Sequence, residues 1–348
     1  MRSYEHALVV GKFAPLHRGH QLDLDAAIAH APVVTIVIWS NPDFPTMTNE
    51  VRANWLRELY PRATVIVGHD GPSNDAPDID QHRYVAALLQ RHGATPDVVF
   101  TSESYGPGFA SFLGASHEFV DPDRTTVPAS GTLLRSDLHA HRDLLDPRVY
   151  RHFVERVVFL GAESTGKSTL AARMAGELAT AFVPEYGRDH FAERGGQLDL
   201  DDYVEIAVRH RALEDAAALR ANRYLFVDTN AITTMFFSHY YNRDSGPDLR
   251  KLADDCRIRY QHVIVCADDI PFEQDGWRDN LVWRGRMQGM VVHDLAVRGI
   301  SHSTVHGSLE PRVEQVKAIL AGTYTSSAEQ RHALGSNAPT VRHRGRGE

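Results

Sequence analysis

The 348-residue chain is 43% hydrophobic and carries a formal net charge of −8. This length can hold two domains of ordinary size, and the composition is typical of α/β proteins. The negative charge argues against a general nucleic-acid binder, because such a protein needs a basic surface to neutralise phosphates. We therefore expect small-molecule ligands and no nucleic-acid partner.

The cysteine content and the hydropathy pattern indicate the compartment. The two cysteines, Cys256 and Cys266, imply no disulfide framework and fit a reducing environment. The N-terminus lacks a signal-peptide pattern, and no apolar run has the length that a membrane span needs. We expect a cytoplasmic protein without a membrane partner, and the oligomeric state, a homo-oligomer included, stays open.

In the first half of the chain, apolar strand patterns alternate with helical patterns, which is typical of a parallel, doubly wound sheet. The expected strands are 7–10, 33–39, 64–67 and 97–101, and the expected helices are 50–59 and 82–92.

The first of these strands is followed by the string GKFAPLHRGH at 11–20. Gly11 allows close approach of the backbone to a ligand, and Lys12, His17 and His20 can donate hydrogen bonds to charge that develops on a phosphate. The alternative is that His17 and His20 are solvated histidines at the start of a helix. This would suffice for a single histidine, but it does not explain the whole string. We expect a nucleotide site at this strand-to-helix turn.

The segment around Pro147 separates the halves, giving expected domains at 1–147 and 153–323 and a disordered, basic tail at 326–348. We expect the second domain to be a nucleoside-kinase fold with a parallel sheet. Its expected helices are 168–179, 200–221, 233–240, 284–297 and 310–320, and its expected strands are 157–160, 224–228 and 262–266.

Residues 161–169 read GAESTGKST, a complete phosphate-loop pattern between an apolar strand and a helix. The glycines let successive amide groups face phosphate oxygens, Lys167 reaches the β- and γ-phosphates, and Ser168 binds Mg²⁺. The residues predicted to bind nucleotide here are Gly161, Ser164, Thr165, Gly166, Lys167, Ser168 and Thr169.

Phosphoryl transfer needs a group that aligns the attacking hydroxyl. Glu185 is our first candidate for this base, with a surface ion pair to Arg188 as the alternative. Asp228 ends an apolar strand, so it can hold Mg²⁺ or substrate at the edge of the sheet; the alternative is a helix N-cap. Arg278 is the candidate lid cation, with Arg284 and Arg286 as competitors. The alternative for these two competitors is a solvated helix face.

Phe272, Trp277 and Trp283 offer flat faces for a ring of the substrate, with simple packing as the alternative. Arg52, in a predicted helix, either assists the first site or lies on the surface.

The string GKFAPLHRGH resembles the signature of nucleotidyltransferases that transfer AMP, and SGTLLR at 130–135 resembles their second motif. Together with the phosphate loop, EYGRD at 185–189, VDTNAITT at 227–234, TSE at 101–103, VDPDR at 120–124 and DGWR at 275–278, they make the chain similar to the NadR family. That family comprises bifunctional nicotinamide-nucleotide adenylyltransferases and ribosylnicotinamide kinases. The resemblance implies a Rossmann-like transferase domain at 1–147 and a phosphate-loop kinase domain at 153–323.

The same resemblance implies roles for further residues of the first domain. Arg135 contacts the ATP phosphates as a catalytic residue. The residues implied in cofactor binding are Gly11, Phe13, Thr101, Ser102, Glu103, Ser130 and Thr132. The segment at 78–88, DIDQHRYVAAL, departs from the tryptophan-rich pattern of the family and leaves His82 and Tyr84 as the rings available for nicotinamide.

The resemblance implies that the kinase phosphorylates ribosylnicotinamide and that the transferase converts the mononucleotide to NAD, with ATP as co-substrate and Mg²⁺ in both steps. The small-molecule partners would then be ATP, ribosylnicotinamide, the mononucleotide and NAD. Two alternatives stay open: the same chemistry on another cofactor precursor, or a sensor that binds NAD without turnover. Because the first strand begins within about six residues of Met1, we expect no DNA-binding helix-turn-helix before it.

Overall fold

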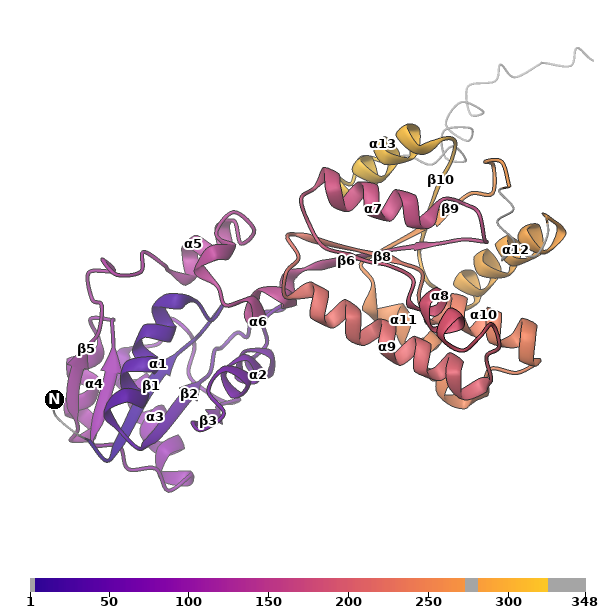
Figure 1. Cartoon of the computed structure of the whole chain (residues 1–348). Coiled ribbons are helices and arrows are strands. Elements are labelled where there is room, and N and C mark those ends of the chain that lie inside the picture. The colour runs from indigo at the N-terminus through magenta and orange to yellow at the C-terminus, as the bar shows by residue number, and fades with distance from the viewer. Residues whose placement is uncertain (1–3, 273–280, 325–348) are drawn as a thin grey trace, which may run out of the picture. The chain divides into compact units, whose positions relative to one another are not determined.

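Two parallel five-stranded sheets organise the computed structural model, which describes residues 4–272 and 281–324. The chain divides into unit 1 (Met1–Phe153) and unit 2 (Val154–Glu348), with one sheet in each (Figure 1). The boundary expected near Pro147 falls in a short helix just before this division. The predicted tail and Arg278 lie outside the described residues. No helix of the described part is long and apolar enough to cross a membrane.

Unit 1 alternates strands and helices from its first strand to its fifth. Its elements are β1 (His6–Gly11), α1 (Arg18–His30), β2 (Val33–Ile38), α2 (Asn49–Leu59), β3 (Thr64–Val67), α3 (Asp78–Arg91), β4 (Val98–Thr101), α4 (Gly106–Leu113), β5 (Ser116–Phe119), α5 (Gly131–Ser136) and α6 (Pro147–Tyr150), with 3₁₀ turns at Arg142–Leu144 and Arg151–Phe153.

The strand order of unit 1 is β3-β2-β1-β4-β5, and every pair in it is parallel. The order reverses between β1 and β4, because the chain first winds outward through β2 and β3 and then returns to the other side of β1. Ligands of such sheets bind at the carboxyl ends of the strands flanking this reversal. The turn after β1 and the segment after β4 therefore form the expected ligand edge.

Unit 2 begins a second alternation of the same kind. Its elements are β6 (Glu155–Leu160), α7 (Lys167–Glu177), β7 (Phe182–Val183), α8 (Tyr186–Glu193), α9 (Leu200–Ala218), β8 (Tyr224–Asp228), α10 (Ala231–Asn242), α11 (Gly246–Arg259), β9 (His262–Cys266), α12 (Leu281–Val297), β10 (Ser303–Val305) and α13 (Leu309–Leu320).

In unit 2 the strand order is β10-β9-β6-β8-β7, again parallel throughout. Helices α7 and α13 cover one face of this sheet, and α9, α10 and α11 lie on the other (Figure 1). One core forms where α7 and α13 pack on the sheet, and it includes Phe159, Leu170, Met174, Phe226 and Val316. With β6 at the centre, the loop that follows it lies between the ends of β8 and β9.

The predicted fold class is confirmed, and three strands, Thr64–Val67, Tyr224–Asp228 and His262–Cys266, begin and end where the sequence indicated. The helix expected at 82–92 was placed too late, since it begins at Asp78 with acidic residues in its first turn. Helix α11 and strand β10 were not predicted. The reason is that α11 buries only Leu249, Ala253 and Cys256, and β10 has three residues.

Two candidate nucleotide sites

The turn after β1 brings His17 and His20 together. His17 is the N-cap of α1, and the two imidazole rings stack with centroids 3.6 Å apart and an interplanar angle of 17°. Each ring also accepts a backbone N–H at Nδ1: His20 N lies 3.3 Å from His17 Nδ1, and His17 N lies 3.4 Å from His20 Nδ1. The neutral rings must then carry their protons on Nε2. The capping interaction thus leaves each ring with its Nε2–H group as the donor that can meet a ligand.

Both imidazoles are held in the neutral state. Burial, and then the guanidinium groups of Arg124 and Arg135, lower the pKa of His17 to about 4. Burial, followed by His17 and Arg124, lowers the pKa of His20 well below its usual value. At neutral pH these side chains are therefore hydrogen-bond donors without charge, so the cationic role falls to other groups of this edge.

The cationic groups of this site are Lys12, in the same turn, and Arg135, in α5. Arg135 is exposed, donates to the carbonyl of Ala14 and lies 3.3 Å from Thr132 Oγ1. Ser130 caps α5 through its hydroxyl, which accepts the N–H of Leu133 at 3.1 Å. Lys12 is exposed, and its pKa is lowered chiefly by burial of part of the side chain. Arg135 is thus anchored to the turn that carries the imidazoles.

Two residues predicted for this site, Phe13 and Thr101, have buried side chains that contact neighbouring residues. The Phe13 ring is buried, lies under Gly11 and packs edge-on against His20. Thr101, at the end of β4, is also buried, and its hydroxyl accepts the N–H of Glu103 at 2.9 Å. We interpret both residues as supports of the site.

Beyond β4, the predicted Ser102 and Glu103 are occupied by neighbours that sequence reasoning missed. Ser102 donates to Asp23 of α1 at 2.7 Å, and burial raises the pKa of Asp23 to about 6. Glu103 forms a 2.9 Å ion pair with Arg124. Because Arg124 also depresses the pKa of both imidazoles, it is a further cation at this edge.

Arg52 is no surface residue, contrary to one of its two expected roles. It is fully buried, and its Nη2 lies 2.7 Å from Asp43 Oδ1. The guanidinium also donates to the carbonyl of Lys12. Arg52 therefore fixes the loop after β2 to the turn that carries the imidazoles, which is a structural role.

In unit 2, the phosphate loop has the predicted strand-turn-helix context, between β6 and α7. Gly161 has φ +136°, and a Cβ there would lie 2.7 Å from the carbonyl oxygen of Cys266. Thr165 Oγ1 and Lys167 Nζ each donate to the carbonyl of Ala162 at 2.8 Å. The side chains on the loop thus brace its own backbone.

Two arginines hold this loop from other elements. Arg312 of α13 is buried and donates to the carbonyls of Thr165 and Ala267. Arg284 of α12 is also buried and donates to the carbonyl of Ser164 at 3.1 Å. The solvated helix face considered for Arg284 is therefore wrong, whereas Arg286 is exposed.

A cavity of about 680 Å³ opens beside the phosphate loop. It is lined by residues of the phosphate loop and by Ile270, Pro271, Gly307, Leu309 and Arg312. Residues that follow β7 and β8, and residues of α8, α9 and α10, also line it: Glu185, Tyr186, Arg188, Phe191, Tyr203, Ile206, His210, Thr229, Thr233, Phe237 and Tyr241. The cavity is large enough for a nucleotide and a small acceptor.

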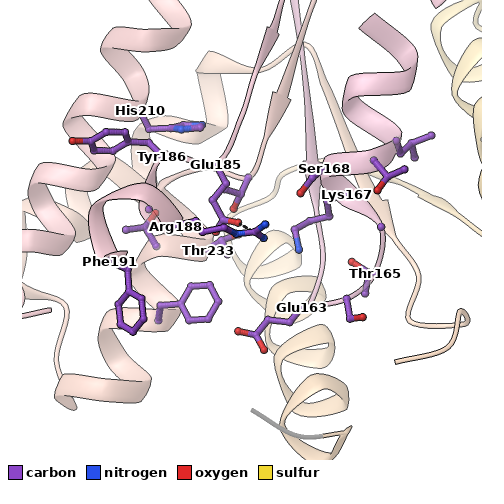
Figure 2. Close-up of a pocket in the computed structure, with 18 of the residues that line it drawn as sticks. Glu163, Thr165, Lys167, Ser168, Glu185, Tyr186, Arg188, Phe191, His210 and Thr233 are labelled. Atoms are coloured by element: carbon purple, nitrogen blue, oxygen red, sulfur yellow. Dashed lines mark ion pairs between the residues drawn. The ribbon is translucent and has the colours of Figure 1, made fainter. Parts of the chain in front are cut away.

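Glu185 and Lys167 both point into this cavity (Figure 2). Burial, and then the neighbouring Asp228 carboxylate, raise the pKa of Glu185, against the opposing charges of Lys167 and Arg188. The ion pair considered as an alternative does form, with 3.5 Å between Arg188 Nη2 and Glu185 Oε2. Because Arg188 is 67% exposed, this pair does not prevent Glu185 from meeting a substrate.

Asp228 ends β8 and is almost fully buried. Its Oδ1 has no hydrogen-bond partner among residues 4–272 and 281–324. The N-cap alternative is wrong, because Asn230 caps α10 by accepting the N–H of Ile232 at 3.0 Å. A buried carboxylate oxygen without a partner fits the oxygen ligands that Mg²⁺ prefers.

The aromatic residues that line the cavity are not the predicted ones. Trp283 is buried and stacks on Tyr240 with centroids 3.7 Å apart, and Phe272 lies by Arg284. Trp277 lies outside the described residues. In unit 1, Tyr84 packs against Trp39, and His82 against Phe109.

Among the described residues, His190, Asp202 and Glu205 form a group of possible metal ligands that is not part of the predicted sites. Asp202 is already engaged, since it pairs with Arg194 at 2.7 Å and accepts the N–H of Asp199 at 3.0 Å. We interpret this group as the bracing of α8 against the start of α9.

Comparisons with known proteins show which proteins this chain is similar to. A family model described as an AAA domain matches residues 156–312. Over 319 residues the chain is 29% identical to the "Trifunctional NAD biosynthesis/regulator protein NadR" of Salmonella typhimurium, and equally to that of Escherichia coli. Each alignment covers 84% of this chain and 77% of the relative.

Solved structures agree on the fold. A crystal structure of NadR protein in complex with NR has a TM-score of 0.70 and 22% identity, covering 93% of this chain and 98% of that chain. A second, in complex with NAD and AMP-PNP, has a TM-score of 0.69 and 21% identity, covering 94% and 98%. These structures therefore share the fold of this chain.

Proposed function

We propose that the chain, which is 29% identical to two NadR proteins over 84% of its length, makes NAD from ribosylnicotinamide in two ATP-dependent steps. Unit 2 phosphorylates the riboside to the mononucleotide, and unit 1 transfers AMP to that mononucleotide. The observation that supports this most directly is that two turns with different sequence patterns, each typical of phosphate binding, lie at the carboxyl edge of their own parallel sheets.

In the kinase step, the 5′-hydroxyl oxygen of the riboside attacks the γ-phosphorus of ATP. The bond from this phosphorus to the β-γ bridging oxygen breaks, and ADP leaves. Glu185 accepts the hydroxyl proton, for which its raised pKa makes it a better base than an ordinary carboxylate. Lys167 neutralises charge on the transferring phosphoryl group.

Ser168 and Asp228 are the residues of unit 2 that would hold Mg²⁺. When bound, the ion screens the negative charge of the ATP phosphates. Asp228 is well suited to this position because its Oδ1 is buried without a protein partner in the described part of the chain.

In the transferase step, a phosphate oxygen of the mononucleotide attacks the α-phosphorus of ATP, and the bond to the β-phosphate breaks with loss of pyrophosphate. No base is needed, because the attacking phosphate is already ionised. The Nε2–H groups of His17 and His20 donate to the oxygens of the α-phosphate, while Lys12 and Arg135 neutralise the departing pyrophosphate.

The test separates the two steps with one substitution in each unit. Purified wild type, Lys167→Ala and His20→Ala are incubated with ribosylnicotinamide, ATP and Mg²⁺, and the products are separated by chromatography. We expect Lys167→Ala to make no mononucleotide but still to convert supplied mononucleotide to NAD. We expect His20→Ala to accumulate mononucleotide. Each variant is the folding control for the other, and two intact steps in both variants would refute the site assignments.

The same assay distinguishes the two alternatives. If the chain acted on another cofactor precursor, wild type would form no NAD from the mononucleotide and ATP. A sensor without turnover would bind NAD and release neither ADP nor pyrophosphate with either substrate.

A further inference from the structure

One wall of the unit 2 cavity carries buried polar groups that the two proposed steps do not use. Thr229 and Thr233 line the cavity and are 5% and 2% exposed. Their hydroxyl oxygens, and Nε2 of the equally buried His210, have no hydrogen-bond partner in the described part of the chain. Leaving such a group without a partner costs about 1–3 kcal/mol. Three such groups at one wall suggest that a ligand supplies the partners.

The backbone at this wall is strained. Thr229 directly follows β8 and has φ +66°, a left-handed conformation that is rare for a β-branched residue. The N–H of Thr229 donates to the carbonyl of Phe159 at 3.1 Å, and the imidazole of His210, in α9, forms a hydrogen bond with the backbone of Thr229. Strain of this kind is typically retained at ligand sites. Thr233 follows one helical turn later, in the first turn of α10.

The adjacent Thr234 shows that this helix can satisfy a threonine internally. Thr234 also lines the cavity, but its hydroxyl donates to the carbonyl of Asn230 at 3.3 Å. A threonine in a helix has two accessible side-chain rotamers, one of which allows this bond to the preceding turn. Thr233 does not make such a bond and can present its hydroxyl to the cavity by rotation about one side-chain bond.

The charge of this wall indicates the ligand group. Burial lowers the pKa of His210, so its ring is neutral, and Glu214 Oε1 lies 3.8 Å from its Nε2. Asp228 adds a second buried carboxylate. An anion would be repelled here, whereas a hydroxyl group can donate to the imidazole and exchange hydrogen bonds with the threonines. Figure 2 shows His210 and Thr233 on the same side of the cavity as Glu185, with Lys167 opposite.

We infer that Thr229, Thr233 and His210 bind the secondary hydroxyls of the acceptor's sugar and thereby direct its primary hydroxyl towards Glu185 and Lys167. This inference rests on the proposed kinase step and identifies the secondary hydroxyls of the sugar as the part of the substrate that the site recognises. The site should accept ribosides and discriminate against deoxyribosides and against acceptors with an anionic sugar.

The test is a substrate-by-variant comparison of kcat/KM for wild type, Thr233→Val, Thr233→Ser and Thr234→Val. The acceptors are ribosylnicotinamide and its 2′-deoxy and 3′-deoxy analogues. We expect Thr233→Val to lose about 10-fold on the riboside, the value of one hydrogen bond, and less than about 2-fold on the analogue that lacks the bonded hydroxyl. Thr233→Ser should recover most of the loss, and Thr234→Val should match wild type on all acceptors.

An unchanged ATP affinity shows that unit 2 of each variant is folded. An equal loss on all three acceptors would overturn the inference, because the hydroxyl of Thr233 would then not meet the sugar. If wild type phosphorylated none of the acceptors, the proposed kinase step itself would fail, an outcome distinct from equal losses in an active enzyme.

Discussion

Replacing Arg52 by methionine should destabilise unit 1 far more than its position in a surface-like helical pattern suggests. The guanidinium is fully buried, pairs with Asp43 and donates to four further oxygen acceptors. Methionine fills a similar volume but donates no hydrogen bond. The groups that lose a donor are the carbonyls of Lys12 and Met47 and the side chains of Ser40, Asp43 and Asn49.

The size of the effect follows from these contacts. Breaking a buried ion pair by removing one partner costs about 3–5 kcal/mol. Because Asp43 is 37% exposed and water can solvate it, we expect about 3 kcal/mol in the free energy of unfolding of unit 1. For a unit of this size, that corresponds to a fall in Tm on the order of 10 °C.

Differential scanning calorimetry of the full chain measures this change, with Arg57→Met as the matched control. Arg57 lies on the same helix, but its side chain is 46% exposed and pairs only with Glu50 and Asn54 among the described residues, so its loss should cost less than about 1 kcal/mol. Arg52→Met should also slow AMP transfer, because it frees the Lys12 turn, and leave phosphorylation by unit 2 unchanged. Equal stability of the two variants would refute this account of Arg52.

Three further predictions concern both units. His17→Asn keeps an N-cap but removes a group whose folded pKa of about 4 lies below its unfolded value of about 6.5. His17 should therefore contribute a loss of stability of on the order of 3 kcal/mol as pH falls from about 6.5 to 4. In pH-dependent urea unfolding the variant should lose less stability than wild type by this amount, whereas the contribution of His20, of the same sign, and that of Asp23, of opposite sign, stay in both; equal losses in the two proteins would contradict the assignment. Gly161→Ala should abolish ATP binding in a calorimetric titration, because Gly161 has φ +136° and a Cβ there would lie 2.7 Å from a backbone oxygen. The control is Gly176→Ala, inside α7 with open space around it, which should raise the stability of unit 2 by about 0.5–1 kcal/mol. Normal ATP affinity of Gly161→Ala would contradict the geometry. Ser168→Ala should raise the Mg²⁺ concentration that half-saturates the kinase step while AMP transfer keeps its Mg²⁺ dependence, and an unchanged titration would remove Ser168 from the metal site.

The sequence determined the features that depend on short stretches of chain. The two turns at 11–20 and 161–169 require glycine, histidine and lysine at fixed spacing, and the strands before them are contiguous apolar runs. Local backbone geometry and the period of apolar residues specify such features with little help from the rest of the fold. The parallel class of both sheets followed from the same alternation.

Only the tertiary structure decided what the arginines and threonines do. Arg52, Arg284 and Arg312 lie in helices whose sequence allows an exposed guanidinium, yet each is buried against carbonyl groups brought from loops distant in the sequence. Thr233 and Thr234 are adjacent and identical, but only one has its hydroxyl satisfied. Burial and hydrogen-bond partners are properties of the packed neighbours, and these are absent from any local window of sequence, because the chain creates them only when it folds.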